Sequence, residues 1–317
     1  MSPMRCSKRQ IAIVAPLMCL LAVPAVAQLP AGVNVSYAIA GGDVTLNEPV
    51  FLVLSVDNRL PEPVSVDLGM NYDSGFRAKL TRPDGKVVDR SQPVARTSEI
   101  VVPGVEFVPP LKTFAKRLLL NKWFVFDAPG RYALDVELTI PILVNPSLSA
   151  DQYVRRELDV ARTKPIPVNG VAAPSPTAGH VELTVRDRNP THLAALCEEL
   201  QRRAALPGPG RRDAAEALSY VNDPVAVPYL KAMLEGNANE DLVIDGLARI
   251  GDAAAVEALI SQTDHPDLPT RTRVIGSLIQ IARRSEDEAL RQRIRDVLLQ
   301  VSPGAAASIS PGPAAPK

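Results

Sequence analysis

Two stretches decide the fold of the second half of the chain: LSYVNDPVAVPYL at residues 218–230 and LARIGDAAAVEAL at residues 247–259. The second begins 29 residues after the first, and each contains an apolar helix end, a turn, an aspartate and a second apolar segment. A third, more degenerate copy is predicted at 271–299. One helix pair cannot bury its apolar face alone, so the pattern predicts a stack of about three pairs.

The turns within these copies resemble those of HEAT-like repeats of the bilin-lyase type, in which GDxxAV links two helices. Residues 251–256 read GDAAAV, and residues 222–227 read NDPVAV with asparagine in place of glycine. The resemblance implies a short α-helical HEAT-like solenoid over residues 188–300. The motif consists of structural residues, so no lyase activity follows from it.

Polar residues in this half have simple structural interpretations. Asp223 and Asp252 could take part in acid–base chemistry, but each precedes a helix, which favours capping. Asn189 followed by Pro190 predicts the start of the first helix. Cys197 falls on the apolar face of that helix, so we predict a small core residue rather than a nucleophile.

The first half shows the period-two alternation of β-strands rather than helical spacing. The alternating runs are residues 64–68, 76–80, 114–120, 132–140 and 181–185. Residues 49–56 are apolar at nearly every position, which predicts a central strand covered on both faces. Glycine- and proline-rich turns separate these runs, and the pattern indicates an antiparallel β-sandwich.

The segment FDAPGRYALDV at 126–136 resembles the penultimate corner and strand of bacterial immunoglobulin-like domains. Residues 46–58 resemble an early strand of the same domains, although the cysteine pair of antibody domains is absent. The resemblance implies an Ig-like β-sandwich over residues 28–187. The BsuPI-type proteinase-inhibitor domain has a similar layout, but the likeness does not carry an inhibitory function to this chain.

Three aromatic residues, Trp123, Phe124 and Phe126, lie just before this corner. Such a cluster could form a platform for a ligand. Sandwiches commonly use aromatic residues at this place to fill the core, so we predict that all three are core residues.

Residues 1–27 have the features of a secretory signal peptide. A basic start is followed by an apolar run at 11–23 and by Ala-Val-Ala, which predicts cleavage after Ala27. The run is shorter than the roughly 20 residues that a membrane-spanning helix needs, and we expect no later span. Lipid attachment at Cys19 is the alternative that the residues before it disfavour. A secreted or periplasmic protein is therefore expected, with Cys197 as its one remaining cysteine.

Charge and motifs exclude several classes of function. The chain has 35 basic and 35 acidic residues, and loss of the three basic residues of the leader leaves a net charge near −3. Nucleic-acid binding needs a concentrated positive field, so none is expected. His180, His192 and His265 are predicted in a linker, at a helix start and in a loop, without metal-ligand spacing. We predict no catalytic residues, no cofactor and no enzymatic activity.

The leading hypothesis is an exported, non-catalytic scaffold that binds a protein partner through the repeats. In the usual layout the second helix of each pair lines the concave face, which would place Lys231, Glu257 and Arg291 near the partner. The alternatives are a protease inhibitor that acts through a loop at 89–110 and an unrecognised hydrolase. Residues 301–317 are predicted to form a disordered tail.

Overall fold

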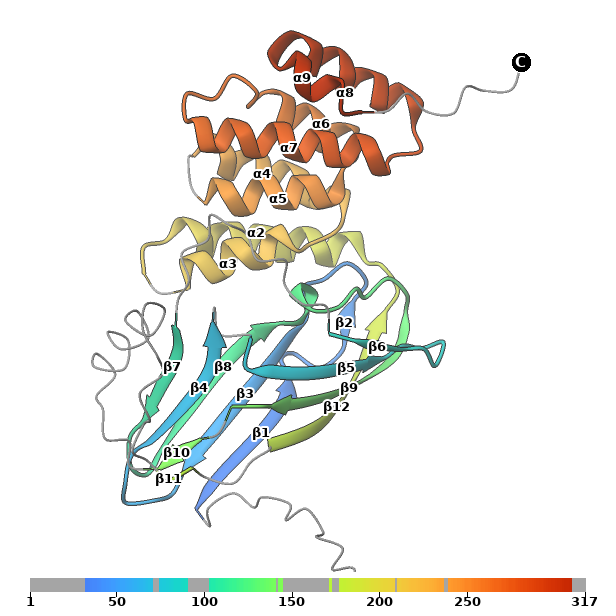
Figure 1. Ribbon diagram of the computed structural model, residues 1–317. Helices are drawn as coiled ribbons and strands as arrows, with labels where there is room; N and C mark the ends of the chain where they lie inside the picture. Colours follow the sequence, from blue (N-terminus) through green and yellow to red (C-terminus); the bar gives the residue numbers. More distant parts are fainter. Residues whose placement is uncertain are drawn as a thin grey trace, which may run out of the picture.

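A computed structural model describes residues 32–70, 74–90, 103–140, 142–144, 171–172, 177–208, 210–236 and 239–309. These residues form a strand-rich region followed by a helical region (Figure 1). Among them, no helix combines the length and apolar character needed to cross a bilayer. The signal peptide predicted at 1–27 lies outside the described residues.

Twelve described strands form three sheets, with the strand orders β1-β3-β8, β11-β10-β4-β7 and β2-β12-β9-β5-β6. All pairs are antiparallel except β2 with β12. The strands are β1 (Val33–Ile39), β2 (Val44–Thr45), β3 (Phe51–Asn58), β4 (Val64–Met70), β5 (Phe76–Thr81), β6 (Val87–Asp89), β7 (Pro103–Val108), β8 (Lys112–Leu119), β9 (Gly130–Leu138), β10 (Leu143–Val144), β11 (Val171–Ala172) and β12 (Thr177–Arg186).

The predicted alternation is clearest in β9, which lies between β5 and β12. Its inward-facing side chains, Tyr132, Leu134, Val136 and Leu138, are all buried, whereas the residues between them are partly or fully exposed. Successive side chains of a strand point to opposite faces, so β9 buries one face and leaves the other in contact with solvent.

Strand β3 differs from its prediction. The apolar run at 49–56 predicted burial on both faces, but from Val50 onward only alternate residues, namely Val50, Leu52, Leu54 and Val56, are fully buried. Phe51 and the other residues of the opposite face are half-buried. Strand β3 is central within a three-stranded sheet, and on its outer face Phe51 packs against the helical region.

One apolar core is shared by the three sheets. Trp123, Phe124 and Phe126 are buried in it, which confirms the prediction that they fill the core. Trp123 lies 5.5 Å from the ring of Phe76, and Phe126 meets the ring of Tyr132 edge-on at 5.3 Å. Aromatic pairs favour such tilted and edge-on arrangements over face-to-face stacking.

Eight described α-helices form the helical region, and two short 3-10 helices accompany them. The α-helices are α2 (Pro190–Ala205), α3 (Arg211–Ser219), α4 (Val227–Glu235), α5 (Glu240–Ile250), α6 (Ala253–Ile260), α7 (Leu268–Arg284), α8 (Glu288–Val301) and α9 (Pro303–Ala306). The 3-10 helices are η1 (Leu120–Lys122), in the strand-rich region, and η2 (Pro224–Ala226).

The first helix begins as predicted. The side chain of Asn189 accepts a hydrogen bond from the backbone N–H of His192 at 3.1 Å, and Pro190 occupies the first helical position. Leu193 and Cys197 are buried on its apolar face. Asparagine satisfies an amide that would otherwise lack an acceptor, so it fixes where the chain turns into α2.

The helices form two rows that enclose one apolar core (Figure 1). In the first row, α3 contacts α5 and α5 contacts α7; in the second row, α2, α4, α6 and α8 contact one another in that order. The third repeat predicted at 271–299 corresponds to α7 and α8. Successive helix pairs therefore bury their apolar faces against neighbouring pairs.

The two predicted repeat turns contain the expected caps. Gly251 ends α5 in the left-handed conformation, with φ of 63°, which glycine adopts without a steric penalty. Asp252 then accepts a hydrogen bond from the N–H of Ala255 at 2.7 Å. Asp223 accepts one from the N–H of Val225 at 3.1 Å. The capping interpretation of both aspartates is confirmed.

The segment predicted as a tail at 301–317 is ordered over its first part. Pro303–Ala306 form α9, which packs against α8. Ala306 and Ile309 are buried in the helical core. The composition of this segment suggested too little apolar surface for order, but α9 contacts both α7 and α8, and Arg283 donates to the carbonyl of Ser308 at 3.1 Å. Residues 310–317 lie outside the described residues.

The predicted linker at 171–179 also belongs partly to the sheets. Val171–Ala172 form β11, and β12 begins at Thr177. His180 therefore lies within β12 rather than in a linker, where it is paired in register with Asp135 of β9.

A glycine sets the distance between α3 and α5. A Cβ atom at Gly246 would lie 2.9 Å from the Cα of Ser219 and 3.0 Å from its carbonyl oxygen. Backbone atoms cannot move away as a flexible side chain can. The close approach of the two helices therefore depends on the missing side chain of Gly246.

We predict that Gly246→Ala lowers the free energy of unfolding by about 1–3 kcal/mol, because the new methyl group overpacks the contact with Ser219. Gly276 is the matched control, since it is also helical and a Cβ there would meet nothing within 4 Å. Gly276→Ala should raise the stability by up to about 1 kcal/mol through helix propensity. Urea unfolding monitored by circular dichroism measures both, and equal effects would contradict the packing argument.

Candidate functional site

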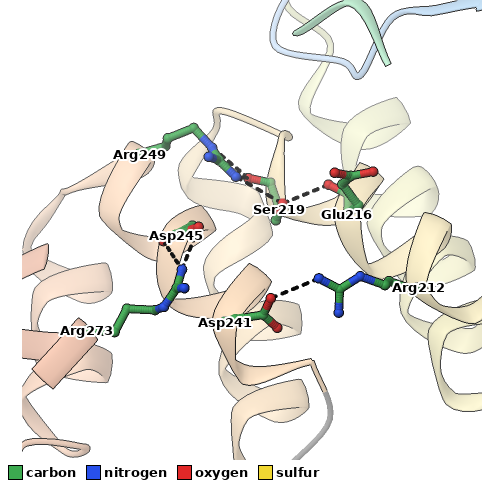
Figure 2. Close-up of polar contacts among 7 residues, drawn as sticks. All are labelled: Arg212, Glu216, Ser219, Asp241, Asp245, Arg249 and Arg273. Atoms are coloured by element: carbon green, nitrogen blue, oxygen red, sulfur yellow. Dashed lines mark hydrogen bonds and ion pairs between the residues drawn. The ribbon is translucent and has the colours of Figure 1, made fainter. Parts of the chain in front are cut away.

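A series of polar contacts links α3, α5 and α7, the helices of the first row (Figure 2). We call it the polar ladder, and it consists of Arg212, Glu216, Ser219, Asp241, Asp245, Arg249 and Arg273. Arg212 of α3 donates to Asp241 of α5 at 3.0 Å. Arg273 of α7 donates to both carboxylate oxygens of Asp245 at 3.2 and 3.1 Å. Each rung thus joins one helix to the next.

Arg249 of the polar ladder caps the end of the preceding helix. Its guanidinium donates to the carbonyl of Ser219 at 3.1 and 2.9 Å and to the Ser219 hydroxyl at 3.0 Å. The same group stacks on Tyr220, 3.8 Å from the ring centroid. Helix C-termini leave carbonyls without partners and carry partial negative charge, which a guanidinium satisfies. Arg284 repeats this arrangement at the end of α5.

The ion pairs of the polar ladder differ in burial, and Arg212 and Asp241 keep 67% and 40% of their side-chain exposure. The side chains of Asp245 and Arg273 retain only 14% and 26% of their exposure, respectively. Ion pairs that are partly withdrawn from water and held by two hydrogen bonds contribute more than exposed pairs do. The Asp245–Arg273 pair therefore stabilises the stack, whereas the Arg212–Asp241 pair remains accessible to solvent.

The second row contains the three residues predicted to face a partner. Lys231 of α4 lies 4.0 Å from Glu235 and keeps 55% of its side-chain exposure. Glu257 of α6 keeps 53% and accepts from Arg293 of α8, which lowers the pKa of the Glu257 carboxyl. Arg291 is paired with Glu288 and is only 19% exposed. The structure thus leaves two of the three predicted residues open to solvent.

The histidines lie apart from one another and next to carboxylates. His180 contacts Asp135 at 2.8 Å, and this hydrogen bond raises the pKa of the His180 imidazole. His192 lies 3.2 Å from Glu48, and His265 lies 3.8 Å from Glu240. Among the described residues, no group of three or more His, Cys, Asp or Glu side chains could hold a metal ion.

Cys197 is buried, and its burial raises the pKa of the thiol to about 12. A thiol with so high a pKa is protonated at neutral pH and is a poor nucleophile. The prediction of a core residue is confirmed for this position. The inhibitory loop predicted at 89–110 is described only at its ends, because 91–102 lie outside the described residues.

The outer face of β5, β9 and β12 has a shallow hollow lined by charged residues. Arg77 contacts Glu137 across β5 and β9 at 3.5 Å, and Lys79 lies 3.8 Å from Asp89. The side chains of Arg77 and Lys79 are more than half exposed. Cross-strand pairs of opposite charge are the usual composition of a solvated sheet face, so this hollow gives no specific indication of a ligand.

A buried aspartate connects the two regions. Asp223 has no exposed surface and accepts two hydrogen bonds from Arg188, at 2.5 and 2.9 Å. It also accepts one from the side-chain amide of Asn47, in the strand-rich region, at 3.1 Å. These contacts, led by the hydrogen bond from Arg188, lower the pKa of Asp223 to about 2. The carboxylate is therefore ionised at any ordinary pH.

Further contacts surround this aspartate. The N–H of Asn222 donates to the carbonyl of Asn47 at 3.3 Å. Lys122 of η1 pairs with Glu216 of α3 at 2.9 Å. The residues that make contacts between the two regions are called the joint. They are Asn47, Glu48, Phe51, Lys122, Arg188, His192, Glu216, Asn222 and Asp223.

The joint was not predicted from the sequence. Asp223 was correctly interpreted as a cap, but its partners Arg188 and Asn47 lie 35 and 176 residues away. The one local signal is Asn222, which stands where the other copy has Gly251. That departure from the repeat motif marks the turn that touches the strand-rich region.

The comparisons support repeats in the helical region. The sequence profile of the PBS lyase HEAT-like repeat matches residues 210–236, which span α3, η2 and α4. A HEAT-like repeat suggests a role in protein interaction or as a scaffold. A search of curated proteins found no match.

Solved structures also match, and two of them illustrate the level of similarity. One is Northeast Structural Genomics Consortium target SoR45, 11% identical over 48% of this chain and 84% of its own, with a TM-score of 0.21. The other is BslA, a bacterial hydrophobin, 15% identical over 51% of this chain and 98% of its own, with a TM-score of 0.20. Similarity at this level carries no argument about fold or function.

We predict that Asp223 makes the free energy of unfolding depend on pH in the acidic range. Its pKa is about 2 in the folded protein and 3.8 in an unfolded chain, so its contribution is complete above about pH 5 and is lost toward pH 2. The stability advantage of the native chain over Asp223→Asn should shrink by about 2 kcal/mol over that range. Denaturant unfolding at pH 5, 3 and 2 measures it, with Asp252→Asn as the control that retains Asp223. Parallel curves for the native chain and Asp223→Asn would refute the assignment.

Proposed function

We propose that this protein is an exported, non-catalytic scaffold that binds a protein partner through its HEAT-like helical region. The match of the HEAT-like repeat at residues 210–236 is the observation that carries the proposal. Stacked helix pairs offer extended surfaces whose shape is fixed by a continuous core, which suits them to hold other proteins. The balanced charge of the chain, near −3 after loss of the leader, favours a protein partner over a nucleic acid.

The second row of helices is the better candidate for the binding surface. In the usual layout of such repeats the second helix of each pair faces the partner, and these helices form the second row. Lys231, Glu257 and Arg293 of this row keep about half of their side-chain exposure. Exposed charges of both signs can pair with a partner at a small desolvation cost.

The strand-rich region is proposed to be an Ig-like β-sandwich over residues 28–187, with the helical repeats over 188–300. The order β12-β9-β5 supports this proposal, because it corresponds to the G-F-C order of immunoglobulin sheets. The hydroxyl of Tyr132 donates to the carbonyl of Ala128 at 2.8 Å, at the start of β9. This contact resembles the tyrosine corner of Ig-like domains.

Export is proposed from the sequence of residues 1–27. The basic start, the apolar run and the small residues at positions 25 and 27 support cleavage after Ala27 and a secreted or periplasmic location. Cys197 is the one cysteine left after cleavage, and it is buried as a free thiol. Its burial is compatible with an oxidising location outside the cytoplasm.

We predict that the double substitution Lys231→Glu and Glu257→Lys reduces partner capture at least about tenfold. Each new charge would have the same sign as the charge on the partner that the native residue pairs with. The measurement is an affinity pull-down from envelope extracts with the tagged chain, quantified by mass spectrometry. The matched control reverses Lys86 and Asp89, which are exposed in the strand-rich region. Equal capture by both variants would exclude the second row as the binding surface. Absence of any partner would count against the scaffold itself.

We predict that the exported chain begins at Gln28. Intact-mass analysis after expression in a bacterial host should show loss of residues 1–27. Ala27→Tyr should block cleavage, because signal peptidase requires a small residue there. Val26→Tyr is the control and should be cleaved normally. Retention of the leader in the native chain would refute export by this route.

A further inference from the structure

The first helix pair would be an open end of the stack without the strand-rich region. Repeat arrays require terminal units that cover the apolar surface left by the last pair. Here Phe51 of β3 packs against the helical core from outside the helical region. The guanidinium of Arg117 lies 4.0 Å from the ring centroid of Phe51. A residue of the sheet thus packs against the apolar core of the helices.

The two repeat turns provide an internal comparison. Asp252 and Asp223 occupy the same position of the motif, and each caps the helix that follows. Asp252 remains partly exposed, whereas Asp223 is fully buried and accepts three additional hydrogen bonds, from Arg188 and Asn47. The additional hydrogen bonds to Asp223 are donated by Arg188, in the chain segment between the regions, and by Asn47, in the strand-rich region. They are not needed for capping.

We infer that the strand-rich region serves as the N-terminal cap of the helical stack, and that Asp223 is the group that fixes the cap in place. Two further contacts join the regions, namely Lys122 with Glu216 and His192 with Glu48. A buried carboxylate is stable only while its partners stay in position, because an unpaired charge in an apolar environment is costly. Separation of the two regions would remove Asn47 from Asp223.

Both ends of the stack are then covered. At the opposite end, Ala306 and Ile309 pack onto the helical core after α8. With the ends covered, the sides of the two rows remain as the broad surfaces of the helical region. The cap therefore gives the strand-rich region a role that is independent of any partner it binds.

Hydrogen exchange of the full chain, read by mass spectrometry, tests this inference. In Asp223→Asn, amide exchange in α2 and α3 should rise at least about tenfold, while exchange in α7 and α8 stays unchanged. The matched control is Asp252→Asn, in which faster exchange should be confined to α5 and α6. The inference is overturned if Asp223→Asn affects only η2 and α4, as loss of a plain cap would, or if exchange rises evenly over all helices.

A milder variant keeps the test informative if Asp223→Asn fails to fold. Asn47 has a positive φ of 73°, a conformation that glycine adopts freely. Asn47→Gly therefore removes the amide that donates to Asp223 without straining the backbone. It should accelerate exchange in α2 and α3 severalfold, with α7 and α8 unchanged. Native exchange rates in α2 and α3 would show that the strand-rich region does not hold this end of the stack.

Discussion

A buried carboxylate constrains the whole arrangement of this protein. Asp223 has no contact with solvent, and its charge is balanced by Arg188 while Asn47 and the N–H of Val225 occupy further lone pairs. An ionised group in such a place costs several kcal/mol unless every partner is present. The start of the helical region, the segment that leads into it and the turn before β3 must therefore be folded together.

Arginine has a recurrent structural role along the stack. Arg249 and Arg284 satisfy the carbonyls at the ends of α3 and α5, and Arg273 bridges α7 to α5. The planar guanidinium can serve two acceptors at once, which a lysine ammonium does with less geometric control. These contacts fix the spacing and rotation of successive helices, as Gly246 fixes the distance between two of them.

Local patterns predicted the elements, whereas contacts between distant segments were not predictable. The alternation at 132–140 and the repeat at 218–259 depend on neighbouring residues, so they identified β9 and the helix pairs correctly. The inter-region partners of Asp223 are far away in sequence, and the nearby signal, Asn222 in place of glycine, does not identify them. The same limit explains the error at Ile309, whose burial depends on the surface that α8 offers rather than on the composition of its own segment.

The charged residues of the two rows of helices differ in how much they contribute to the stack. Charges in the first row hold the helices together, so changing Asp245 or Arg273 would alter the stack itself. In the second row, Lys231 and Glu257 are about half exposed, and their pairs contribute little to stability. Lys231 and Glu257 can therefore be exchanged at little cost in stability, so the proposed binding surface can be altered while the stack that carries it stays intact.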